Sequence, residues 1–375
     1  MKKMIALLLS LFLLITNVLA TAPAEIPVAS PSCILMHPNG TVLYEKNADQ
    51  KMAPASVTKI MTLLLIMEAI ERGELSYDDL IIGSAHAASM GGSQIWLKEG
   101  ESFTLHEMIK CIAVVSANDC CVAVAEHMSG SEEAFVAVMN SRAKELGMYN
   151  TNFVNCCGLE VEGHYTTARD IALMSAELIK HEKIFEYTTI WMDTIRDGAF
   201  GLSNTNKMIK TFKGMIGLKT GYTSTAGYCL SGVAERDGMR LIAVVMKADT
   251  PDARNTSVAA LLNYGFANFS QTKIATDEPL MPVKVILGKS DCVSVKLASE
   301  EYMLIEKSKL AGLEKKIDLV ESVRAPVMEG DELGSFSVYS EGELLLKASL
   351  TAGETVEKMT VFDIWAAILS GSFKR

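Results

Sequence analysis

The segment of residues 53–70, APASVTKIMTLLLIMEAI, constrains the fold more than any other part of the chain. After Pro54 it has the composition of a helix, with apolar residues at almost every position. A helix that is apolar on all sides must be surrounded by other elements, so it belongs at the centre of a domain. Lys59 stands in its first turn, three residues after Ser56. A buried ammonium is costly unless it is paired or loses its proton, so this lysine requires a specific reason.

Strands on both sides of this helix in the chain predict an α+β fold. Two early strands, at residues 32–36 and 41–46, are joined by an Asn-Gly turn, which is a strong hairpin signal. Three late strands are predicted at residues 214–221, 227–234 and 239–247. We expect the five strands to form one antiparallel sheet, with a mostly helical region, residues 54–187, inserted between them.

Apolar periodicity predicts the remaining helices. A polar break at residues 116–119 separates two of them, where its side chains could face a cleft. The predicted helices span residues 105–115, 121–128, 131–146, 167–180 and, after the sheet, 253–269.

The length of 375 residues allows two domains, and the composition changes near residues 277–279. We predict a larger domain at residues 25–272 and, from short alternating apolar stretches, a small β domain at residues 277–352. Residues 353–375 form a C-terminal segment. The formal net charge of −10, without a basic stripe, argues against a nucleic-acid partner.

Residues 1–20 have the pattern of a secretory signal peptide. Lys2 and Lys3 precede an apolar run at residues 4–19, and Ala20 is a suitable cleavage position. The run is shorter than the roughly 18–20 apolar residues of a spanning helix, although an uncleaved membrane anchor is the alternative. We therefore expect an exported protein, in the cell wall or at the outer face of the cytoplasmic membrane.

Eight cysteines in an exported chain raise the question of disulfides. Cys120-Cys121 and Cys156-Cys157 are adjacent pairs, and adjacent cysteines rarely bridge each other. No C-x-x-C occurs, so a zinc site has little support and we predict no metal. Small buried side chains are the favoured interpretation, with some disulfide as the alternative.

Ser56 and Lys59 form the motif S-x-x-K, whose spacing puts both side chains on one face of a helix. A serine hydroxyl is a weak nucleophile until a base takes its proton. A lysine in apolar surroundings is favoured in its neutral form and can be that base, while the helix N-terminus favours a developing oxyanion. Alone, the motif is weak evidence, because many helices contain it by chance.

Two further motifs strengthen the interpretation. Residues 116–118, Ser-Ala-Asn, interrupt a helix pair, and residues 219–221, Lys-Thr-Gly, end an apolar strand. S-x-x-K, S-D-N and K-T-G together are a signature of penicillin-binding proteins and class A β-lactamases. The three motifs occur here in that order, with alanine in place of the central aspartate.

The chain resembles the low-molecular-weight penicillin-binding proteins that are D-alanyl-D-alanine carboxypeptidases. The resemblance runs from about residue 29 to the C-terminus and is carried by ASVTKIMT, SANDCCVAVAEHMSG, HYTTARDIALM, NTNKMI, GLKTGYTSTAGYCLSG, LLNYGFANF and APVMEGDELGSFSVY. It implies a penicillin-binding/β-lactamase-like serine acyltransferase fold followed by a small β domain. It also implies peptidoglycan stem peptides ending in D-Ala-D-Ala as substrates, β-lactam antibiotics as inhibitors, and no cofactor.

The resemblance also implies catalytic roles. Ser56 is the expected nucleophile, which forms the acyl-enzyme, and Lys59 is its general base. Ser116 is expected to relay a proton to the leaving D-alanine amine.

The remaining motif residues are expected to bind substrate. Asn118 would bond the peptide carbonyl and hold Lys59. Lys219 and Thr220 would bind the terminal carboxylate, which suits an ammonium together with a hydroxyl. Gly221 would let the ligand approach closely, and the backbone N–H of Tyr222 would join that of Ser56 in the oxyanion hole.

Some positions depart from the family pattern. Cys120-Cys121 stand where small residues such as alanine are usual. Cys156-Cys157-Gly158 stand where a proline, a variable residue and a glycine are usual, in a loop that borders the site. His164 lies in a helix-start region, and because Lys59 already fills the position of the base, we predict no catalytic role for this histidine.

Two other functions compete with the carboxypeptidase. A class A β-lactamase uses a loop glutamate to activate water, typically in a Glu-x-x-Leu-Asn stretch that is missing here, although Glu160 and Glu162 lie in the corresponding region. A non-catalytic sensor of cell-wall peptides or β-lactams is the other alternative, which the three intact motifs disfavour.

An apolar stripe near the C-terminus predicts a last helix. Its members are Val361, Phe362, Ile364, Trp365, Ile368, Leu369 and Phe373. Residues 360–373 would be about 21 Å long as a helix, too short to span a bilayer but able to lie in its interface. Asp363 interrupts the stripe, and packing against the β domain is the alternative. We predict weak peripheral membrane attachment.

Overall fold

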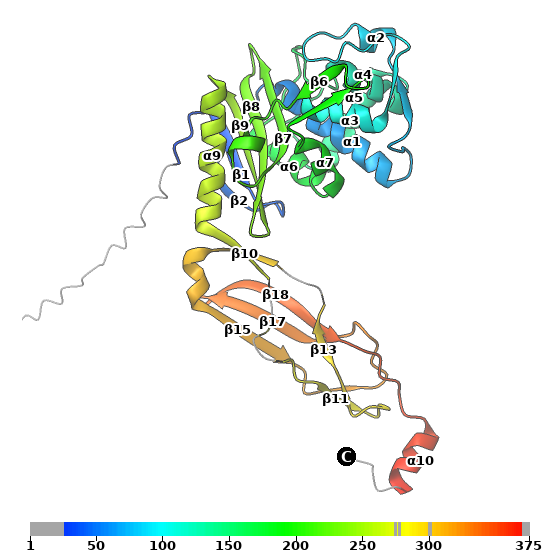
Figure 1. Ribbon diagram of the computed structural model, residues 1–375. Helices are drawn as coiled ribbons and strands as arrows, with labels where there is room; N and C mark the ends of the chain where they lie inside the picture. The colour runs from blue at the N-terminus through cyan, green and yellow to red at the C-terminus, as the bar shows by residue number, and fades with distance from the viewer. Residues whose placement is uncertain (1–25, 274–275, 277–278, 299–301, 370–375) are drawn as a thin grey trace, which may run out of the picture.

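The computed structural model describes residues 26–369, except 274–275, 277–278 and 299–301, and shows two bodies joined end to end (Figure 1). The predicted signal peptide and the residues Phe373, Lys374 and Arg375 lie outside this range. The upper body contains a sheet with helices on both faces, and the lower body is an elongated β domain with the helix α10 at its far end. Among the described residues, no helix combines the length and the apolar composition needed to cross a bilayer.

The first body is built around one antiparallel sheet with the strand order β2-β1-β9-β8-β7. Its strands are β1 (Ser32–Met36), β2 (Val42–Lys46), β7 (Met215–Thr223), β8 (Gly227–Arg236) and β9 (Met239–Ala248). The prediction of a single five-stranded sheet that unites the start and the end of this domain is confirmed. Strand β1 is buried on both faces, which explains why it lacks the apolar-polar alternation of a half-exposed strand.

Helices cover both faces of the sheet. On one face α9 (Pro251–Asn268) packs on β8 and β9, and its apolar contacts include Leu35 and Leu241. Thr250 caps this helix by accepting a hydrogen bond from the backbone N–H of Ala253, and proline follows at the first helical position. On the other face α6 (Ala168–Leu178) packs on β1 and β9.

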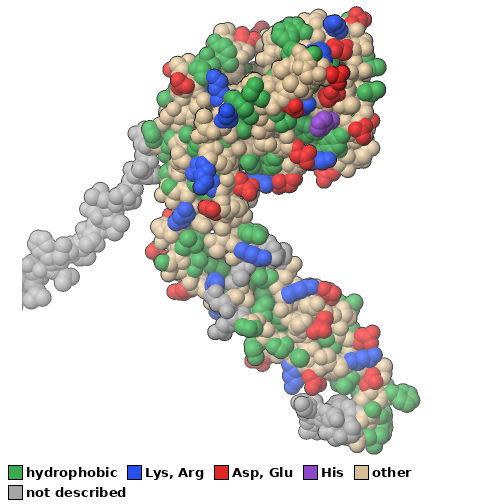
Figure 2. Space-filling view, in the orientation of Figure 1, with side chains coloured by type: hydrophobic (Ala, Val, Ile, Leu, Met, Phe, Trp, Pro, Cys, Tyr) green, Lys and Arg blue, Asp and Glu red, His purple; other side chains and the backbone are tan. Residues whose placement is uncertain are grey.

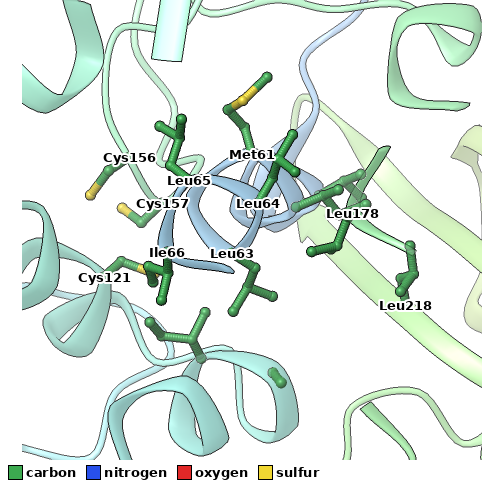
Figure 3. Packing of buried hydrophobic residues seen from close by; sticks show 14 of the residues in the cluster. Met61, Leu63, Leu64, Leu65, Ile66, Cys121, Cys156, Cys157, Leu178 and Leu218 are labelled. Carbon is green, nitrogen blue, oxygen red and sulfur yellow. The ribbon is translucent and has the colours of Figure 1, made fainter. Parts of the chain in front are cut away.

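The predicted central helix lies where its composition requires. It begins as a 3₁₀ turn, η1 (Ala55–Thr58), and continues as α1 (Lys59–Glu71), in which only Glu68, Ile70 and Glu71 are not buried. Figure 3 shows side chains of this helix packed among residues from several other elements. Helices α3 (Leu105–Val114), α4 (Asn118–Ser129) and α5 (Glu132–Glu145) contact it, as does α6. The other helices of this domain are α2 (Ala85–Ala88), η2 (Glu182–Ile184), α7 (Phe185–Thr188) and α8 (Met208–Thr211).

Two details of the helical region differ from the sequence prediction. Helix α4 begins at Asn118, three residues earlier than predicted, because the break after α3 needs only the residues 115–117. Two small two-stranded sheets were not predicted; their strands have only three or four residues each. They are β3 (Leu80–Ile82) with β4 (Ser102–Thr104), and β5 (Met192–Ile195) with β6 (Phe200–Ser203).

The β domain has two small cores. One four-stranded sheet has the order β13-β18-β17-β15, and a three-stranded sheet has the order β12-β11-β16. The strands are β11 (Val283–Ile286), β12 (Cys292–Val293), β13 (Val295–Leu297), β15 (Leu313–Leu319), β16 (Ser322–Arg324), β17 (Glu332–Ser340) and β18 (Glu343–Ala352). Phe336 is fully buried in the core beside the larger sheet.

A two-stranded ladder connects the two bodies. Strand β10 (Phe269–Lys273) directly follows α9 and pairs antiparallel with β14 (Tyr302–Glu306) of the β domain. The 3₁₀ turn η3 (Lys307–Gly312) follows, and Lys307 Nζ donates a hydrogen bond to the backbone carbonyl of Phe266 in α9, at 2.7 Å. The composition change near residues 277–279 therefore comes after β10, which follows the last helix of the first body and pairs with a strand of the second.

Candidate active site

The serine of the S-x-x-K motif lies in the 3₁₀ turn that starts the central helix. Ser56 is partly exposed, whereas its neighbours Ala55 and Val57 are buried. Ala55 has a φ of 49°, in the left-handed region that a residue with a Cβ rarely adopts. The turn thus holds the serine at the surface of a cleft while the residues around it anchor the helix in the core.

Lys59 is fully buried and makes three hydrogen bonds. Its Nζ lies 3.0 Å from Ser56 Oγ, 2.7 Å from Asn118 Oδ1 and 2.6 Å from the backbone carbonyl of Cys157. Three acceptors match the three protons of an ammonium, which answers why a lysine is tolerated in this apolar helix. The same geometry puts a basic nitrogen within proton-transfer distance of the serine hydroxyl.

Asn118 is oriented by the loop that precedes β4. Its Nδ2 donates to the backbone carbonyl of Gly91 at 2.7 Å, and its backbone N–H donates to the carbonyl of Ser93 at 2.7 Å. Gly92 has a φ of +79°, and a Cβ there would lie 2.9 Å from Asn118 Nδ2. The loop therefore directs the amide oxygen of Asn118 toward Lys59, and a side chain at residue 92 would disturb this arrangement.

Ser116 occupies the break between α3 and α4 in a strained conformation. Its φ is 66°, again in the left-handed region, which costs a residue with a Cβ about 1 kcal/mol or more. The residue is 3% exposed, and its Oγ has no hydrogen-bond partner among the described residues. A buried hydroxyl without a partner, at the wall of a pocket, is available to a bound ligand.

Strand β7 supplies the opposite wall. A Cβ at Gly221 would lie 2.9 Å from the carbonyl oxygen of Pro54 and 3.0 Å from the backbone nitrogen of Ser56, so only glycine lets this strand pack so closely on the turn of the nucleophile. Thr220 Oγ1 donates to Thr205 Oγ1 at 2.7 Å. Tyr222 is exposed, and its ring stacks on that of Tyr228 with 4.3 Å between centroids.

Lys219 is almost completely buried, at 1% exposure, and its Nζ donates to the backbone carbonyl of Thr220. Burial lowers the pKa of Lys219 well below its usual value, and the nearby Lys59 ammonium lowers it further. Two ammonium groups in one desolvated region repel each other. A carboxylate bound nearby would oppose both effects, because it stabilises the charged form of a lysine.

Five of the eight predicted site residues line one pocket of about 380 Å³: Ser56, Ser116, Thr220, Gly221 and Tyr222. The other three, Lys59, Asn118 and Lys219, are buried residues that do not line it. The structure thus brings all three motifs together. It places their lysines and the asparagine behind the pocket wall rather than on its surface.

Two cations at the pocket were missed by the sequence prediction. Lys207 lines it and belongs to the stretch NTNKMI, to which the resemblance pointed without assigning a role. Arg254 lines it from the first turn of α9, is 6% exposed, and has its pKa lowered by burial. A cation in the first turn of a helix is unfavourable next to the positive end of the helix dipole. An arginine at the start of the predicted helix at residues 253–269 was therefore the signal in the sequence that could have identified this residue.

His164 is held by two hydrogen bonds within the fold. Its Nδ1 accepts a hydrogen bond from the backbone N–H of Val154 at 3.0 Å, and its Nε2 bonds Thr58 Oγ1 at 2.9 Å. Burial lowers the pKa of His164 to about 4, so the ring is neutral at physiological pH. Glu160 accepts a hydrogen bond from the backbone N–H of Thr225, and with His164 and Glu162 it lines a neighbouring pocket of about 360 Å³.

All eight cysteines are free, and seven of them are buried. The exposed one is Cys292 in the β domain. Burial agrees with the favoured sequence interpretation, and no bridge is formed by either adjacent pair. Gly158, which follows the second pair, packs so tightly that a Cβ there would lie 1.9 Å from the carbonyl oxygen of Ala55.

Comparison with known proteins agrees with this geometry. The family model "D-alanyl-D-alanine carboxypeptidase" matches residues 18–250, and "Penicillin-binding protein 5, C-terminal domain" matches residues 269–358. The chain is 42% identical to the D-alanyl-D-alanine carboxypeptidase DacF of Bacillus subtilis, over 88% of this chain and 86% of that protein.

Solved structures give the same result. Penicillin-binding protein 5 of Haemophilus influenzae superposes with a TM-score of 0.75 at 28% identity, covering 90% of this chain and 99% of that one. Penicillin-binding protein D2 of Listeria monocytogenes, in an ampicillin-bound form, superposes with a TM-score of 0.57 at 33% identity, covering 64% of this chain and 99% of that one. The first alignment extends over both bodies of the molecule.

Proposed function

The chain belongs to the family of D-alanyl-D-alanine carboxypeptidases, and from this premise we propose that Ser56 and Lys59 carry the acylation step. The protein is a serine-type peptidase that removes the terminal D-alanine from peptidoglycan stem peptides through an acyl-enzyme, and it binds penicillin. One observation carries the assignment of the residues: Lys59 Nζ lies 3.0 Å from Ser56 Oγ while two other acceptors hold it in place.

Acylation follows from this arrangement. Ser56 Oγ attacks the carbonyl carbon of the penultimate D-alanine and gives its proton to Lys59 Nζ. For this step Lys59 must be uncharged, with its two N–H groups on Asn118 Oδ1 and the Cys157 carbonyl and its lone pair toward the serine. The oxyanion that forms is stabilised by the backbone N–H groups of Ser56 and Tyr222. When the C–N bond breaks, the leaving amine receives the proton through Ser116, whose hydroxyl is otherwise without a partner among the described residues. Water then attacks the ester, which releases the shortened peptide and restores Ser56.

Substrate binding uses the cationic side of the pocket. We assign the terminal carboxylate to Thr220, with Lys219 behind it and Arg254 at the pocket wall as sources of positive potential. Asn118 holds Lys59 through its Oδ1, and we assign the second hydrogen of its Nδ2, which already donates one to Gly91, to the peptide carbonyl. Charge-assisted bonds in a desolvated pocket are about twice as strong as neutral ones, so a free C-terminal carboxylate is the preferred recognition element.

Labelling with a fluorescent penicillin, followed by mass mapping of the modified peptide, tests the assignment. We expect a single label on Ser56, and Ser56→Ala should remove both the label and the release of D-alanine from a pentapeptide. A label on another serine would overturn the assignment. Repeated turnover of penicillin without release of D-alanine would instead indicate a β-lactamase, and labelling without either turnover would indicate a sensor.

We further propose that the protein works outside the cytoplasm and attaches weakly to the outer face of the cytoplasmic membrane through α10 (Val361–Leu369). Val361, Phe362, Trp365, Ile368 and Leu369 are between 54% and 88% exposed. Figure 2 shows hydrophobic side chains gathered at this end of the molecule.

The start of α10 supports a stable helix. Thr360 and Asp363 exchange hydrogen bonds: the backbone N–H of Asp363 donates to Thr360 Oγ1, and the Asp363 carboxylate accepts from the backbone N–H of Thr360. Asp363, which looks like an interruption in the sequence, thus closes a helix cap. An exposed apolar stripe on a capped helix is suited to the membrane interface.

A further inference from the structure

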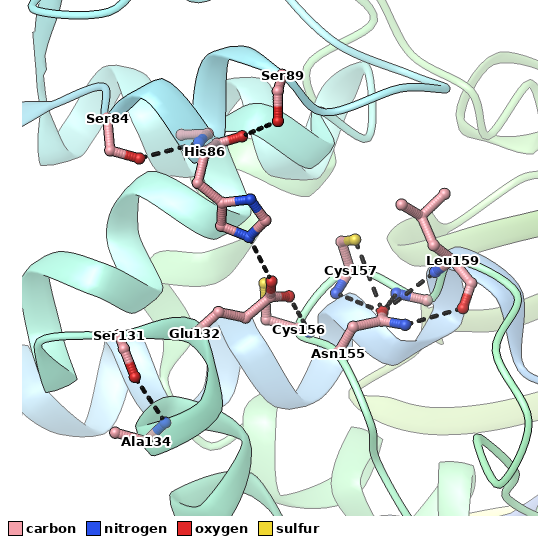
Figure 4. Close-up of polar contacts among 12 residues, drawn as sticks. Ser84, His86, Ser89, Ser131, Glu132, Ala134, Asn155, Cys156, Cys157 and Leu159 are labelled. Atoms are coloured by element: carbon pink, nitrogen blue, oxygen red, sulfur yellow. Dashed lines mark hydrogen bonds and ion pairs between the residues drawn. The ribbon is translucent and has the colours of Figure 1, made fainter.

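Three metal-ligand atoms meet beside the catalytic lysine, in a place that the reaction does not use. They are a carboxylate oxygen of Glu132 and the sulfurs of Cys156 and Cys157, all within 4.8 Å of one another. Both cysteines are fully buried, and the side chain of Glu132 is 13% exposed. Figure 4 shows the Glu132 carboxylate, at the start of α5, below His86, with Cys156 next to it and Cys157 to the right on the same loop.

We propose that Glu132, Cys156 and Cys157 form a binding site for a soft divalent cation of the zinc and cadmium class. Thiolates with one carboxylate are ligands that such ions accept in tetrahedral geometry. Metal–sulfur bonds of about 2.3 Å place tetrahedral ligand atoms about 3.5–4 Å apart, so the three atoms need to move together by about 1 Å or less. Three protein ligands leave the fourth position to water.

The ligands are held in place by a second layer of contacts. Asn155 Oδ1 accepts hydrogen bonds from the backbone N–H groups of Gly158 at 2.6 Å and Leu159 at 3.1 Å, which fixes the loop. Glu132 Oε1 accepts from the backbone N–H of Cys156 at 3.0 Å, and Glu132 Oε2 lies 2.9 Å from His86 Nε2. Such outer contacts orient ligands, and the half-exposed His86 marks the side from which an ion can enter.

A second thiol pair in the same domain is the natural control. Cys111 and Cys120 also contact each other and are buried. They belong to no group of three ligand atoms among the described residues. If two close thiols were enough, this pair would bind the ion as well.

Titration of the full chain with Cd²⁺, followed by its thiolate charge-transfer absorption, tests the proposal. All measurements start from a Cys292→Ser variant, here called the parent, because this substitution removes the exposed thiol of the β domain. We expect one Cd²⁺ per chain, displaced by Zn²⁺. Cys156→Ser should abolish the band, and Cys111→Ser should leave it unchanged.

Glu132→Gln keeps both thiols and therefore separates the site from a simple thiol pair. It should weaken Cd²⁺ binding by about tenfold or more. The proposal is overturned if the parent shows no band, if Cys111→Ser reduces the band as much as Cys156→Ser, or if Glu132→Gln changes nothing. Penicillin labelling of each variant reports on the active site separately, so a missing metal site leaves the carboxypeptidase assignment untouched.

Discussion

The two bodies of this molecule differ in whether they bury charged side chains. The catalytic domain buries the charged residues Lys59, Lys219 and Arg254 around one pocket. In the described part of the β domain, the buried polar residues are Ser337, Ser340 and Thr351, and none is charged. Its strand β17 follows a simple pattern in which Phe336 and Val338 fill a small core.

Burying a charge costs free energy, so a fold retains one only where partners or function compensate. Lys59 has three hydrogen-bond acceptors, and the catalytic domain has a large core around it that can absorb this cost. The β domain has only two small cores, whose burial gives less free energy to offset the cost of a buried charge. The contrast teaches that buried charge, and with it the chemistry, is concentrated in the catalytic domain, and the following experiments test how far the two domains are independent.

Replacing the catalytic base should have the largest effect. Lys59→Arg keeps a positive charge but cannot accept a proton, because a guanidinium stays protonated. We expect acylation by fluorescent penicillin to slow by about 10³-fold. Circular dichroism should show that the fold is kept, and acylation near the wild-type rate would exclude Lys59 as the base.

Removing the charge behind the pocket should have a smaller effect. Lys219→Gln should lower the rate of acylation by a pentapeptide by about 30–100-fold, because it removes the positive potential that Lys219 supplies to the carboxylate site. A substrate amidated at its C-terminus should lose the same interaction. The two changes together should therefore cost less than their sum in a double-mutant cycle. Full additivity would contradict a contribution of Lys219 to carboxylate binding.

A cavity in the β domain should affect stability and leave catalysis alone. Phe336→Ala should destabilise that domain by about 3–5 kcal/mol, because the side chain is fully buried. D-alanine release at 25 °C should be unchanged as long as the catalytic domain stays folded. The matched control is Phe135→Ala, a fully buried phenylalanine of the catalytic core, which should reduce stability and activity together. A lower kcat in the Phe336 variant would show that the domains are coupled.

Protonation of a buried histidine at acid pH should destabilise the catalytic domain and should have no counterpart in the β domain. Burial depresses the pKa of His164 from 6.5 to about 4, so the unfolded chain binds more protons between these values. The contribution of His164 to stability is complete above pH 6.5, is lost as the pH falls toward about 4, and amounts to on the order of 3 kcal/mol. All six histidines precede residue 182, so the β domain has none.

Urea midpoints at pH 7 and pH 4.5 measure this effect. His164→Gln should flatten the pH dependence of the catalytic transition, whereas the β-domain transition should not change. An equal pH dependence in the wild type and the variant would mean that His164 does not carry the effect.

Removing the terminal helix should have the smallest effect on turnover. Truncation before Thr360 should leave D-alanine release intact, because α10 lies at the far end of the β domain (Figure 1). The same truncation should remove binding to lipid vesicles. Because apolar burial dominates, the full-length protein should bind neutral and anionic vesicles similarly. A protein that ignores vesicles, or a β domain that unfolds after truncation, would refute the membrane proposal.

Much of the catalytic fold could be predicted from the sequence, for identifiable reasons. The central helix is apolar on all sides, and the two early strands have Asn-Gly between them, so local patterns alone determined both. Ser56, Lys59 and the motifs near residues 116–118 and 219–221 were recognised because their spacing is characteristic. The structure confirms that these motifs converge.

Other features have no local signal. The third acceptor of Lys59 is the backbone carbonyl of Cys157, which any residue type would provide. The left-handed conformation of Ser116 depends on how α3 and α4 pack, because serine has no preference for it. The β10–β14 ladder pairs two five-residue strands about 30 positions apart, and such pairing depends on tertiary context. The cysteine cluster lacks C-x-x-C spacing, so only the fold brings Glu132 to it.

Helix α9 runs from the pocket to the junction with the β domain. Its first turn carries Arg254 at the pocket, and its last residue runs without a break into β10 of the ladder. Eighteen helical residues make a rod of about 27 Å, anchored at its lower end by Lys307 as well. The β domain is therefore joined to the catalytic domain by a paired strand and a side-chain hydrogen bond, in addition to the chain itself. One helix leads from this junction to the pocket, so the two bodies share a continuous hydrogen-bonded connection that ends at a pocket-lining arginine.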